Sequence, residues 1–363
     1  MITREMKDIQ HSDVLTSRYI HNRDLSSADG LAIDEAVCEF CDQGKSPSTL
    51  HLYNYVPSVI LGRYQNAAAS LRLDECDRRG IEVNRRITGG GTVFMTPEQM
   101  ALGLVLPNNF PELPQSIKGV FQFLAAIFAD ALSNFGLKAE FMGKNDLTVG
   151  GRKIAGLAIS RDRDNVTFLH TSLLLDFDIA TMLEILNLPR KGLLDRGVSC
   201  FGQRMTTIRQ EAKSKISLEE IQEAVLNSMR KMLNLELPET ELSEEEKARV
   251  EDLKEKQYED DEWIYAARSP KRKTVTVEQK TPGGLLQVHL AQSGGAIESI
   301  MITGDYFSRT RDIVMLESIL KWTAATPDSI RKKLQECRAE TFIHRVDMPV
   351  ILTLITGAIE GKP

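Results

Sequence analysis

The spacing of apolar side chains predicts helices at three places in the first two thirds of the chain. Residues 31–44 and 116–136 place apolar residues every three to four positions, which is the period of an amphipathic helix. Residues 217–233 repeat this pattern and begin with Ser217 and Glu220, whose spacing is typical of a capping box. We therefore expect three helices, each with one apolar face turned toward a core.

Strand-like runs lie around and between these helices. Residues 49–63 predict two short strands broken by a proline, and residues 100–107 form a short apolar run. Residues 146–160 predict a hairpin with two glycines at its tight turn, because glycine accepts positive φ. Residues 166–177 add a further strand, so the mixed order of helices and strands predicts an α+β fold.

A stretch dense in Glu, Asp and Lys divides the chain past its middle. Ser243 and Glu246 lie there at capping-box spacing, and we expect a solvated helix and linker. We assign residues 1–245 to one domain, residues 246–262 to the linker and residues 263–363 to a second, small α+β domain. The second domain is expected to hold strands separated by glycine turns, followed by two helices.

Composition narrows the class of protein. The 363 residues are 42% hydrophobic and 26% charged, as in an ordinary soluble globular protein. A net charge of −6 argues against nonspecific binding to nucleic acid or to a membrane. The sequence starts without an apolar signal segment and has no apolar run of membrane-spanning length. Its five cysteines are few and odd in number, which favours a reducing compartment, so we expect a cytoplasmic protein.

Cys38 and Cys41 are closely spaced and allow two interpretations. A C-x-x-C pair can be a redox or metal site, but no second pair accompanies this one. The residues around it have helical apolar spacing, which favours two thiols buried on a helix. The six histidines show no metal-ligand pattern, and no Cys/His or Ser/His/Asp set can be identified from spacing.

The sequence NRRITGGGTVF, residues 84–94, joins two arginines to three consecutive glycines. It is neither a P-loop nor a dinucleotide-binding turn, and a glycine-rich bulge at a sheet edge is the simplest structural explanation. Neighbouring strand residues point to opposite faces, so one of Arg85 and Arg86 should face whatever the glycines line. A guanidinium there suits a carboxylate or a phosphate.

The hairpin sequence GKNDLTVGGRKIAG, residues 143–156, carries the second candidate site. Lys153 lies among small residues, and a rigidly held ammonium can neutralise charge that develops on an oxygen atom. Asn145 and Asp146 lie at the mouth of the same hairpin, where a carboxylate could hold Mg²⁺ or orient the lysine. An ordinary surface hairpin is the alternative. His170 shares a mostly apolar strand face and, taken alone, is typical of a core histidine.

Together these segments resemble the lipoate–protein ligase A family within the wider biotin/lipoate ligase group. The resemblance rests on RRITGGGTVF, GKNDLTVGGRKIAGLA and FLHTSLLLDFD in that order, preceded by PSVILGRYQN and followed by RGVSCFGQRMTTI. Past Trp263, GGLLQVHLAQSGGAIESIMITGDYF is similar to the accessory C-terminal domain of bacterial ligases. The resemblance implies a class II synthetase-like mixed sheet with flanking helices, plus a small α+β C-terminal domain.

It also implies a two-step reaction. Lipoate and ATP form lipoyl-AMP with Mg²⁺, and the lipoyl group passes to a lysine of a lipoyl-domain acceptor. Such acceptors include 2-oxoacid dehydrogenase E2 domains and the glycine-cleavage H protein. The family further implies a monomer that binds no nucleic acid or membrane, a loop over residues 196–208 that closes on the adenylate, and an accessory domain that then moves.

The same resemblance assigns roles to individual residues. Lys153 is the catalytic residue, and Asp146 lies on the metal side. The residues expected to bind lipoate or the adenylate are Arg86, Thr88, Gly89, Gly90, Gly91, Thr92, Val93, Asn145, Gly156, Ala158 and His170. The glycine loop would run along the acyl chain and the mixed anhydride, while Arg86 would meet the carboxylate or the α-phosphate.

The sequence departs from the family pattern at two places. Met95-Thr96 stands where the family commonly has His-Asp, and Thr171 where it commonly has glycine, so the acyl substrate and acceptor stay open. One alternative is an ATP-independent octanoyl or lipoyl transferase with a cysteine nucleophile just before the hairpin; residues 137–146 contain no cysteine, and Cys200 is a weak substitute. A biotin ligase fits less well, because its arginine-glycine loop has a different order. The presence of Lys153, Asn145 and Asp146 argues against a non-catalytic acyl-binding regulatory protein.

Overall fold

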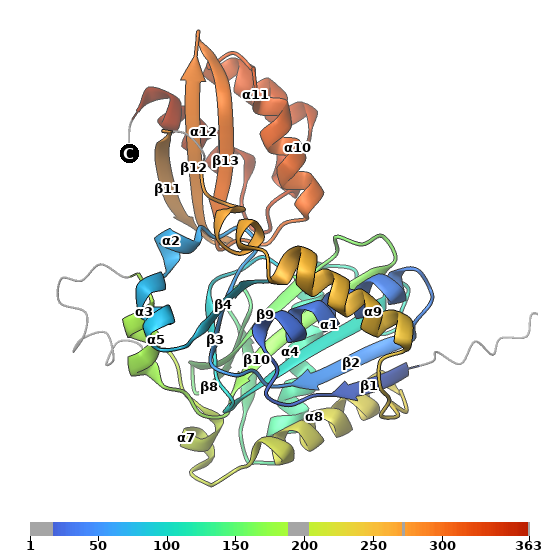
Figure 1. Cartoon of the computed structure of the whole chain (residues 1–363). Coiled ribbons are helices and arrows are strands. Elements are labelled where there is room, and N and C mark those ends of the chain that lie inside the picture. The colour runs from blue at the N-terminus through green and yellow to red at the C-terminus, as the bar shows by residue number, and fades with distance from the viewer. Residues whose placement is uncertain (1–16, 188–202, 271–272, 362–363) are drawn as a thin grey trace, which may run out of the picture.

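The computed structural model describes residues 17–187, 203–270 and 273–361. These residues form a large body and a smaller C-terminal domain that stands on one side of it (Figure 1). No helix in this described part of the chain is both long enough and apolar enough to cross a membrane.

A seven-stranded mixed sheet is the centre of the large body, with the strand order β1-β2-β6-β10-β9-β8-β7. β1 and β2 are parallel, and all other neighbours are antiparallel. The strands are β1 Ser17–His21, β2 Ser48–Tyr53, β6 Gln99–Pro107, β7 Ala139–Met142, β8 Asp146–Val149, β9 Arg152–Ser160 and β10 Val166–Leu174. The hairpin prediction is confirmed, because Gly150 and Gly151 both adopt positive φ between β8 and β9. Helices cover both faces of this sheet, which is why a central strand such as β6 is a nearly continuous apolar run.

One face of the sheet packs against α4 (Ile117–Ser133) and α8 (Leu218–Leu233) around the largest apolar cluster. The other face packs against α1 (Ser27–Asp42). All three predicted helices are confirmed, and Ser217 and Glu220 form the predicted capping box.

Cys38 and Cys41 lie on the buried side of α1 as free thiols, as predicted from the helical spacing around them. Burial raises the pKa of the Cys38 thiol well above its usual range and that of Cys41 to about 11. Within the part of the chain that the structure describes, no group of three or more His, Cys, Asp and Glu side chains could hold a metal ion. The thiols therefore belong to the core.

A second, three-stranded sheet with the order β4-β3-β5 lies beside α1. Its strands are β3 Ser58–Leu61, β4 Glu82–Arg85 and β5 Val93–Met95. Two short helices, α2 (Ala67–Ser70) and α3 (Leu73–Arg78), follow β3, and α5 (Ile179–Ile185) and α7 (Ile208–Ala212) are further short helices that were not predicted. The glycine loop connects β4 to β5, and it therefore lies between the two sheets.

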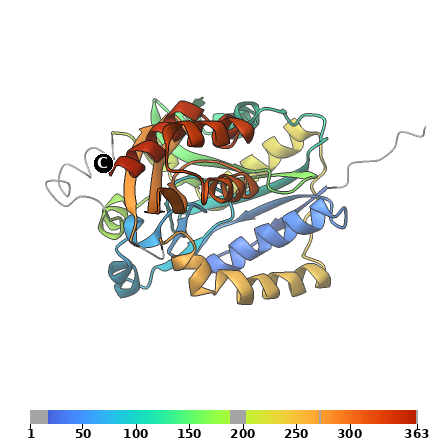
Figure 2. The same ribbon diagram turned by 90° about the horizontal axis from the view of Figure 1, so that it is seen from above.

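The segment expected to be a solvated linker is packed on the large body instead. Ser243 and Glu246 form the predicted capping box of α9 (Glu244–Leu253), which lies alongside α1 (Figure 2). Glu246 is fully buried and forms an ion pair with Arg18, and the Tyr258 hydroxyl donates to the Glu35 carboxylate at 2.6 Å.

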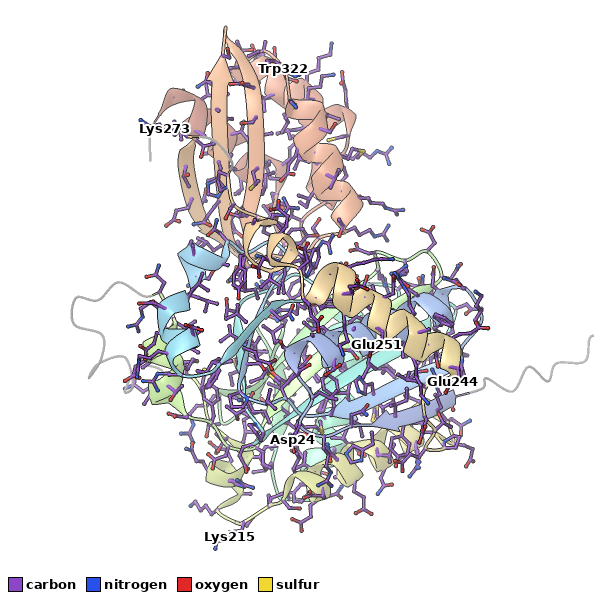
Figure 3. The ribbon with its side chains drawn as sticks, in the orientation of Figure 1. Asp24, Lys215, Glu244, Glu251, Lys273 and Trp322 are labelled. Carbon is purple, nitrogen blue, oxygen red and sulfur yellow. The ribbon has the colours of Figure 1, made fainter. Side chains whose placement is uncertain are left out.

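The expectation of a solvated linker was wrong because only the outer side of α9 carries exposed charged residues, whereas its other side packs on the large body. Glu244 and Glu251 lie along the outer side of the helix (Figure 3), whereas Val250 and Leu253 pack into the cluster beneath α1. Two further turns, at Lys254–Tyr258 and Glu262–Ala266, continue along the body before the chain enters the C-terminal domain.

The C-terminal domain has its own apolar cluster. An antiparallel sheet, β11 (Val275–Thr281), β12 (Gly284–Ser293) and β13 (Ala296–Gly304), packs against helices. Two helices were expected, but three longer ones follow the strands: α10 (Thr310–Leu320), α11 (Pro327–Glu336) and α12 (Met348–Glu360). The strand prediction is confirmed, and the domain is α+β as expected.

Candidate functional site

Small residues from three neighbouring strands form the floor of a pocket. Gly156 of β9 pairs with Ser172 of β10, which pairs with Ala101 of β6, so the three lie in one row across the sheet. Ala158 and His170 form the next pair along the same strands and face the same side, because strand side chains alternate. All five residues line one cavity of about 120 Å³ between the two sheets.

The apolar end of this pocket lies beneath α1. Its lining residues there are Leu31, Tyr53, Tyr55, Ile60, Val93 and Met95. The Tyr53 hydroxyl donates to the Asp34 carboxylate at 2.8 Å, and the Tyr55 hydroxyl lies 3.2 Å from the Tyr53 hydroxyl. Because Tyr53 gives its proton to the carboxylate, Tyr55 donates to Tyr53, and neither hydroxyl has a proton left for a ligand. This end therefore suits an apolar tail.

Lys153 and Asp146 meet at the opposite, polar end. The Lys153 ammonium lies 2.7 Å from the Asp146 carboxylate, and both side chains are about one third exposed. The Asn145 amide donates to the Leu157 carbonyl at 2.6 Å and lines the pocket beside Lys153. A side chain at Gly156 would begin 3.2 Å from the lysine nitrogen, so glycine leaves room for Lys153 to lie along the strand. The structure thus brings the predicted hairpin residues together.

Arg86 lines the pocket but is occupied with the glycine loop. Its guanidinium donates to the carbonyls of Ile60, Gly89 and Gly91 at 2.8–3.1 Å and to the Thr88 hydroxyl at 3.0 Å. These bonds use four of its five N–H groups and leave one Nη1 hydrogen. Burial lowers the pKa of Arg86 to about 10. The arginine is therefore first a brace for the loop, with one donor left for a ligand.

Arg85 points the other way and is also fully buried, although sequence reasoning assigned an inward position to only one arginine of the pair. Its guanidinium donates to the carbonyls of Gly62, Gln65, Trp263 and Ile264, among others. Burial lowers its pKa to about 10. The packed segment at residues 254–266, whose Trp263 and Ile264 carbonyls accept two of these bonds, was not expected from the sequence.

His170 is connected to Arg86 through Thr88. The Arg86 Nε–H donates to the Thr88 hydroxyl, which lies 2.6 Å from Nε2 of His170. Since Thr88 accepts from the arginine, its own proton can go to a neutral imidazole nitrogen. Burial, with a smaller contribution from Arg86, lowers the pKa of His170 to about 3. The histidine is a neutral pocket wall whose partners also hold the glycine loop.

The predicted site residues divide into three groups. Those that line the pocket are Arg86, Gly91, Thr92, Val93, Asn145, Lys153, Gly156, Ala158 and His170. Thr88, Gly89 and Gly90 belong to the same loop but do not line the pocket. Asp146 does not line the pocket either, but it pairs with Lys153, which does. Sequence reasoning missed the aromatic residues Tyr53, Tyr55 and Phe307, since nothing in their local pattern indicates a pocket.

Most of the loop expected to close on the adenylate, residues 196–202, lies outside the described residues, as does Cys200. Its last part pairs with β9, because the Lys153 N–H donates to the Arg204 carbonyl at 2.7 Å and the Thr206 N–H donates to the Lys153 carbonyl at 2.9 Å. The end of the loop is therefore anchored directly beside Lys153.

Two family models match the chain. Residues 26–230 match the lipoyl protein ligase A/B catalytic domain, and residues 271–355 match the bacterial lipoate protein ligase C-terminus. An octanoyltransferase LipM from Brevibacillus brevis is 29% identical, and the match covers 68% of this chain and 97% of that protein. The lipoate–protein ligase LplJ from Bacillus subtilis is 26% identical over 83% of this chain and 88% of its own length.

Solved structures agree on the fold. LipL1 from P. falciparum, determined in complex with lipoate, superimposes with a TM-score of 0.72 at 16% identity and covers 94% of this chain and 98% of its own. A bipartite lipoate protein ligase system from Thermoplasma acidophilum, studied with its E2 lipoyl domain, gives a TM-score of 0.63 at 22% identity. It covers 71% of this chain and 99% of that one. With more than half of its residues matched by the catalytic model, the chain belongs to the lipoyl protein ligase A/B family and carries a C-terminal domain of the bacterial lipoate protein ligase type.

Proposed function

We propose that this protein is an ATP-dependent lipoate–protein ligase. The observation that carries the proposal is the C-terminal domain, residues 271–355, which matches the domain model of bacterial lipoate protein ligases. The match to the octanoyltransferase covers nearly all of that protein but only 68% of this chain. This chain therefore contains a part that the transferase does not match. Phe307, which lies within the matched C-terminal domain, lines the acyl pocket.

The pocket provides for the activation step. The apolar end holds the acyl tail, and the carboxylate comes to lie near Lys153, Asn145 and the remaining Nη1–H of Arg86. One carboxylate oxygen attacks the α-phosphorus of ATP, and the bond to the pyrophosphate oxygen breaks. Lys153 donates to the oxygens on which negative charge increases, and such a preorganised donor acts more strongly in the transition state than in the substrate.

The charge around the glycine loop favours a polyphosphate. Arg85 and Arg86 are both buried, and every hydrogen bond that they make within the described part of the chain goes to a neutral acceptor. Two buried cations without bonded carboxylates create a positive potential, which attracts an anion such as ATP more strongly than it attracts a neutral thioester.

The residues at the polar end fit Mg²⁺. This ion is usually bound by one or two carboxylates together with substrate phosphates, rather than by a protein cage. Asp146 offers a partly exposed carboxylate, and Asn145 keeps its amide oxygen because its bond to Leu157 uses the nitrogen. Asp146 and Asn145 would hold the ion, which supplies positive charge next to the phosphates.

Transfer uses the same end of the pocket. The ε-amine of an acceptor lysine attacks the acyl carbonyl, an amide bond forms, AMP leaves and one proton is released. Lys153 holds the carbonyl oxygen as charge develops on it. We propose lipoyl domains as acceptors, such as those of 2-oxoacid dehydrogenase E2 proteins or the glycine-cleavage H protein, in keeping with the T. acidophilum system solved with its E2 lipoyl domain.

An octanoyl or lipoyl transferase is the second candidate, because the chain is 29% identical to an octanoyltransferase. Such an enzyme would take the acyl group from a thioester onto a cysteine, without ATP. The described cysteines, at positions 38, 41, 76 and 337, do not line the pocket. The segment before β8, where the transferase nucleophile is expected, contains none.

Pyrophosphate release tests the activation step. With ATP and Mg²⁺, we expect pyrophosphate only when lipoate is added, and ³²P-pyrophosphate should exchange into ATP under the same conditions. Decanedioate, which carries a second carboxylate at the tail end, is a matched control that the apolar end should reject. Exchange that does not depend on lipoate or octanoate would contradict the proposal.

A further inference from the structure

The C-terminal domain reaches the glycine loop along one short segment, residues 304–307, which we call the strap. The strap connects β13 to α10. The Gly90 N–H donates to the Tyr306 carbonyl at 3.0 Å, and the Gly304 N–H donates to the Tyr64 carbonyl at 3.0 Å. The rings of Tyr64 and Tyr306 stack with their centres 4.7 Å apart. Backbone and side-chain contacts thus fix the strap on the large body.

Two of the three consecutive glycines lie in close contact with this strap. A side chain on Gly89 would overlap the Tyr306 carbonyl oxygen, and one on Gly90 would lie 3.1 Å from the Phe307 ring. At Gly91 the nearest atom is the Asp305 Cβ at 3.9 Å, which is an ordinary contact. The close approach that requires glycine at position 89 is therefore made by the protein's own C-terminal domain, whereas Gly90 also has a positive φ and lies equally close to Arg86.

Phe307 is the strap residue that enters the site. It is 3% exposed, belongs to the apolar cluster of the large body and lines the acyl pocket. Its ring packs against Phe121 of α4 with the centres 5.7 Å apart. The Lys144 ammonium lies 5.3 Å from the ring centre and donates to the Asp305 carbonyl at 2.7 Å. Phe121 and Lys144 thus both contact the ring, and Lys144 also bonds to the backbone of the strap.

The same contacts place Phe307 at the polar end of the pocket. Gly90 and Lys144, the neighbour of Asn145, both lie close to the ring. An acid whose carboxylate meets Lys153 and Asn145 would have its first methylenes beside this ring. We propose that Phe307 is a specificity-determining residue of the acyl site, which the C-terminal domain supplies and which packs on the carbons next to the carboxylate. This inference rests on the proposed function.

Binding of the acid alone, measured by calorimetry on the full chain, tests the inference. The variants are Phe307→Ala and Phe307→Leu, and the probes are octanoate and 2-methyloctanoate. Asp162→Asn is the matched control, because Asp162 accepts from the Thr310 N–H at 2.8 Å and from its hydroxyl at 2.6 Å. This contact also joins the two domains, but Asp162 does not line the acyl pocket.

Phe307→Ala should weaken octanoate binding by about tenfold, with a smaller effect for Phe307→Leu, because the truncated side chain packs less apolar surface against the ligand. The space left by the ring should also reduce the preference for octanoate over 2-methyloctanoate, which a merely structural role would not change. Asp162→Asn should bind both acids like the wild type. Thermal unfolding of each variant shows that it is folded, and Phe307→Leu serves if Phe307→Ala does not fold.

Other results would overturn the inference in distinguishable ways. Unchanged octanoate binding and unchanged preference in both folded Phe307 variants would remove Phe307 from the acyl site. Equal losses in Asp162→Asn and Phe307→Ala would assign the effect to domain docking alone. If the wild type bound neither octanoate nor lipoate, the proposed function itself would be wrong, whatever the variants did.

Discussion

At the scale of single residues, the cationic side chains of the site are held in two different ways. Arg86 is braced by backbone carbonyls and the Thr88 hydroxyl, so most of its donors are used within the protein. Lys153 has one carboxylate partner, Asp146, and keeps its other N–H groups for a ligand. The arginine thus shapes the loop, and the lysine is the cation best placed to follow the reacting oxygens.

Replacing Lys153 with alanine should therefore slow pyrophosphate release by about 10²–10³, the typical cost of removing one preorganised donor. The fold should be retained, since the side chain is about one third exposed. Lys138→Ala is a matched control, because Lys138 is an exposed lysine of the same hairpin region, paired with Glu140. A Lys153→Ala variant with the wild-type rate would remove this lysine from the mechanism.

His170 should make the stability of the protein depend on pH. Its pKa is about 3 in the folded protein and near 6.5 when unfolded, so the unfolded chain binds the proton first. The stabilisation is complete above pH 6.5 and is lost as the pH falls from there toward 3. Between pH 6.5 and 5 this should cost the wild type about 2 kcal/mol of unfolding free energy.

Urea denaturation at these two pH values gives the comparison, with His170→Asn as the variant. The variant should be less stable at pH 6.5 but should lose less free energy on acidification. Carboxylates with lowered pKa, such as Glu39 and Glu246, contribute mainly at lower pH. An identical loss in wild type and variant would show that His170 does not titrate in this way.

At the scale of elements, the glycine loop and α9 are both fixed by parts of the chain distant in sequence. The loop meets the strap, residues 304–307, and α9 meets Arg18 near the start of the described chain. For each contact, a nearby residue of the same type lacks the contact and can serve as a control. Gly91 lies two residues from Gly89, and a side chain there would make only an ordinary contact with the strap. Glu244 lies on α9 and pairs with Lys247 rather than with Arg18.

Gly89→Ala should displace the strap, whereas Gly91→Ala should not. Neither glycine has positive φ, so the two substitutions differ in the space available and not in backbone strain. Hydrogen exchange at the Gly90 and Gly304 amides reads the displacement directly, since both amides donate across the domain boundary. Equal protection of these amides in the two variants would show that the loop and strap are not coupled.

Glu246→Ala should lower the unfolding free energy by about 3 kcal/mol, because it leaves the buried guanidinium of Arg18 without its carboxylate. It also removes half of the capping box of α9. Glu244→Ala, on the exposed side of the same helix, should cause little change. Chemical denaturation measures both. If the two variants were equally stable, the ion pair beneath α9 would contribute nothing.

Helices and hairpins could be predicted from sequence because their signals are local. The capping residues Ser217 and Glu220 and the turn glycines at 150 and 151 act on their own neighbours. The site could be predicted only in part. Tyr53 and Phe307 enter the pocket through contacts between distant segments, and the burial of α9 depends on Arg18, so no local pattern indicates them.

At the scale of the whole molecule, both domains line the pocket that we propose for the acyl group. The movement of the accessory domain that the family resemblance implies stays a prediction. The contacts it would break include those of Gly90, Tyr64 and Lys144 with the strap and the bonds between Asp162 and Thr310. The Arg85 bonds to Trp263 and Ile264 hold the preceding segment to the large body. A movement would therefore begin after Ile264 rather than in the charged segment before Trp263.

The intact mass of a lipoyl-domain acceptor, after incubation with this protein, tests the central claim most directly. With lipoate, ATP and Mg²⁺, the acceptor should gain one lipoyl group on its lysine, and omission of ATP should leave its mass unchanged. An octanoyl thioester without ATP should also leave it unchanged. Acylation of the acceptor from the thioester without ATP, together with none from lipoate and ATP, would contradict the ligase proposal and establish a transferase.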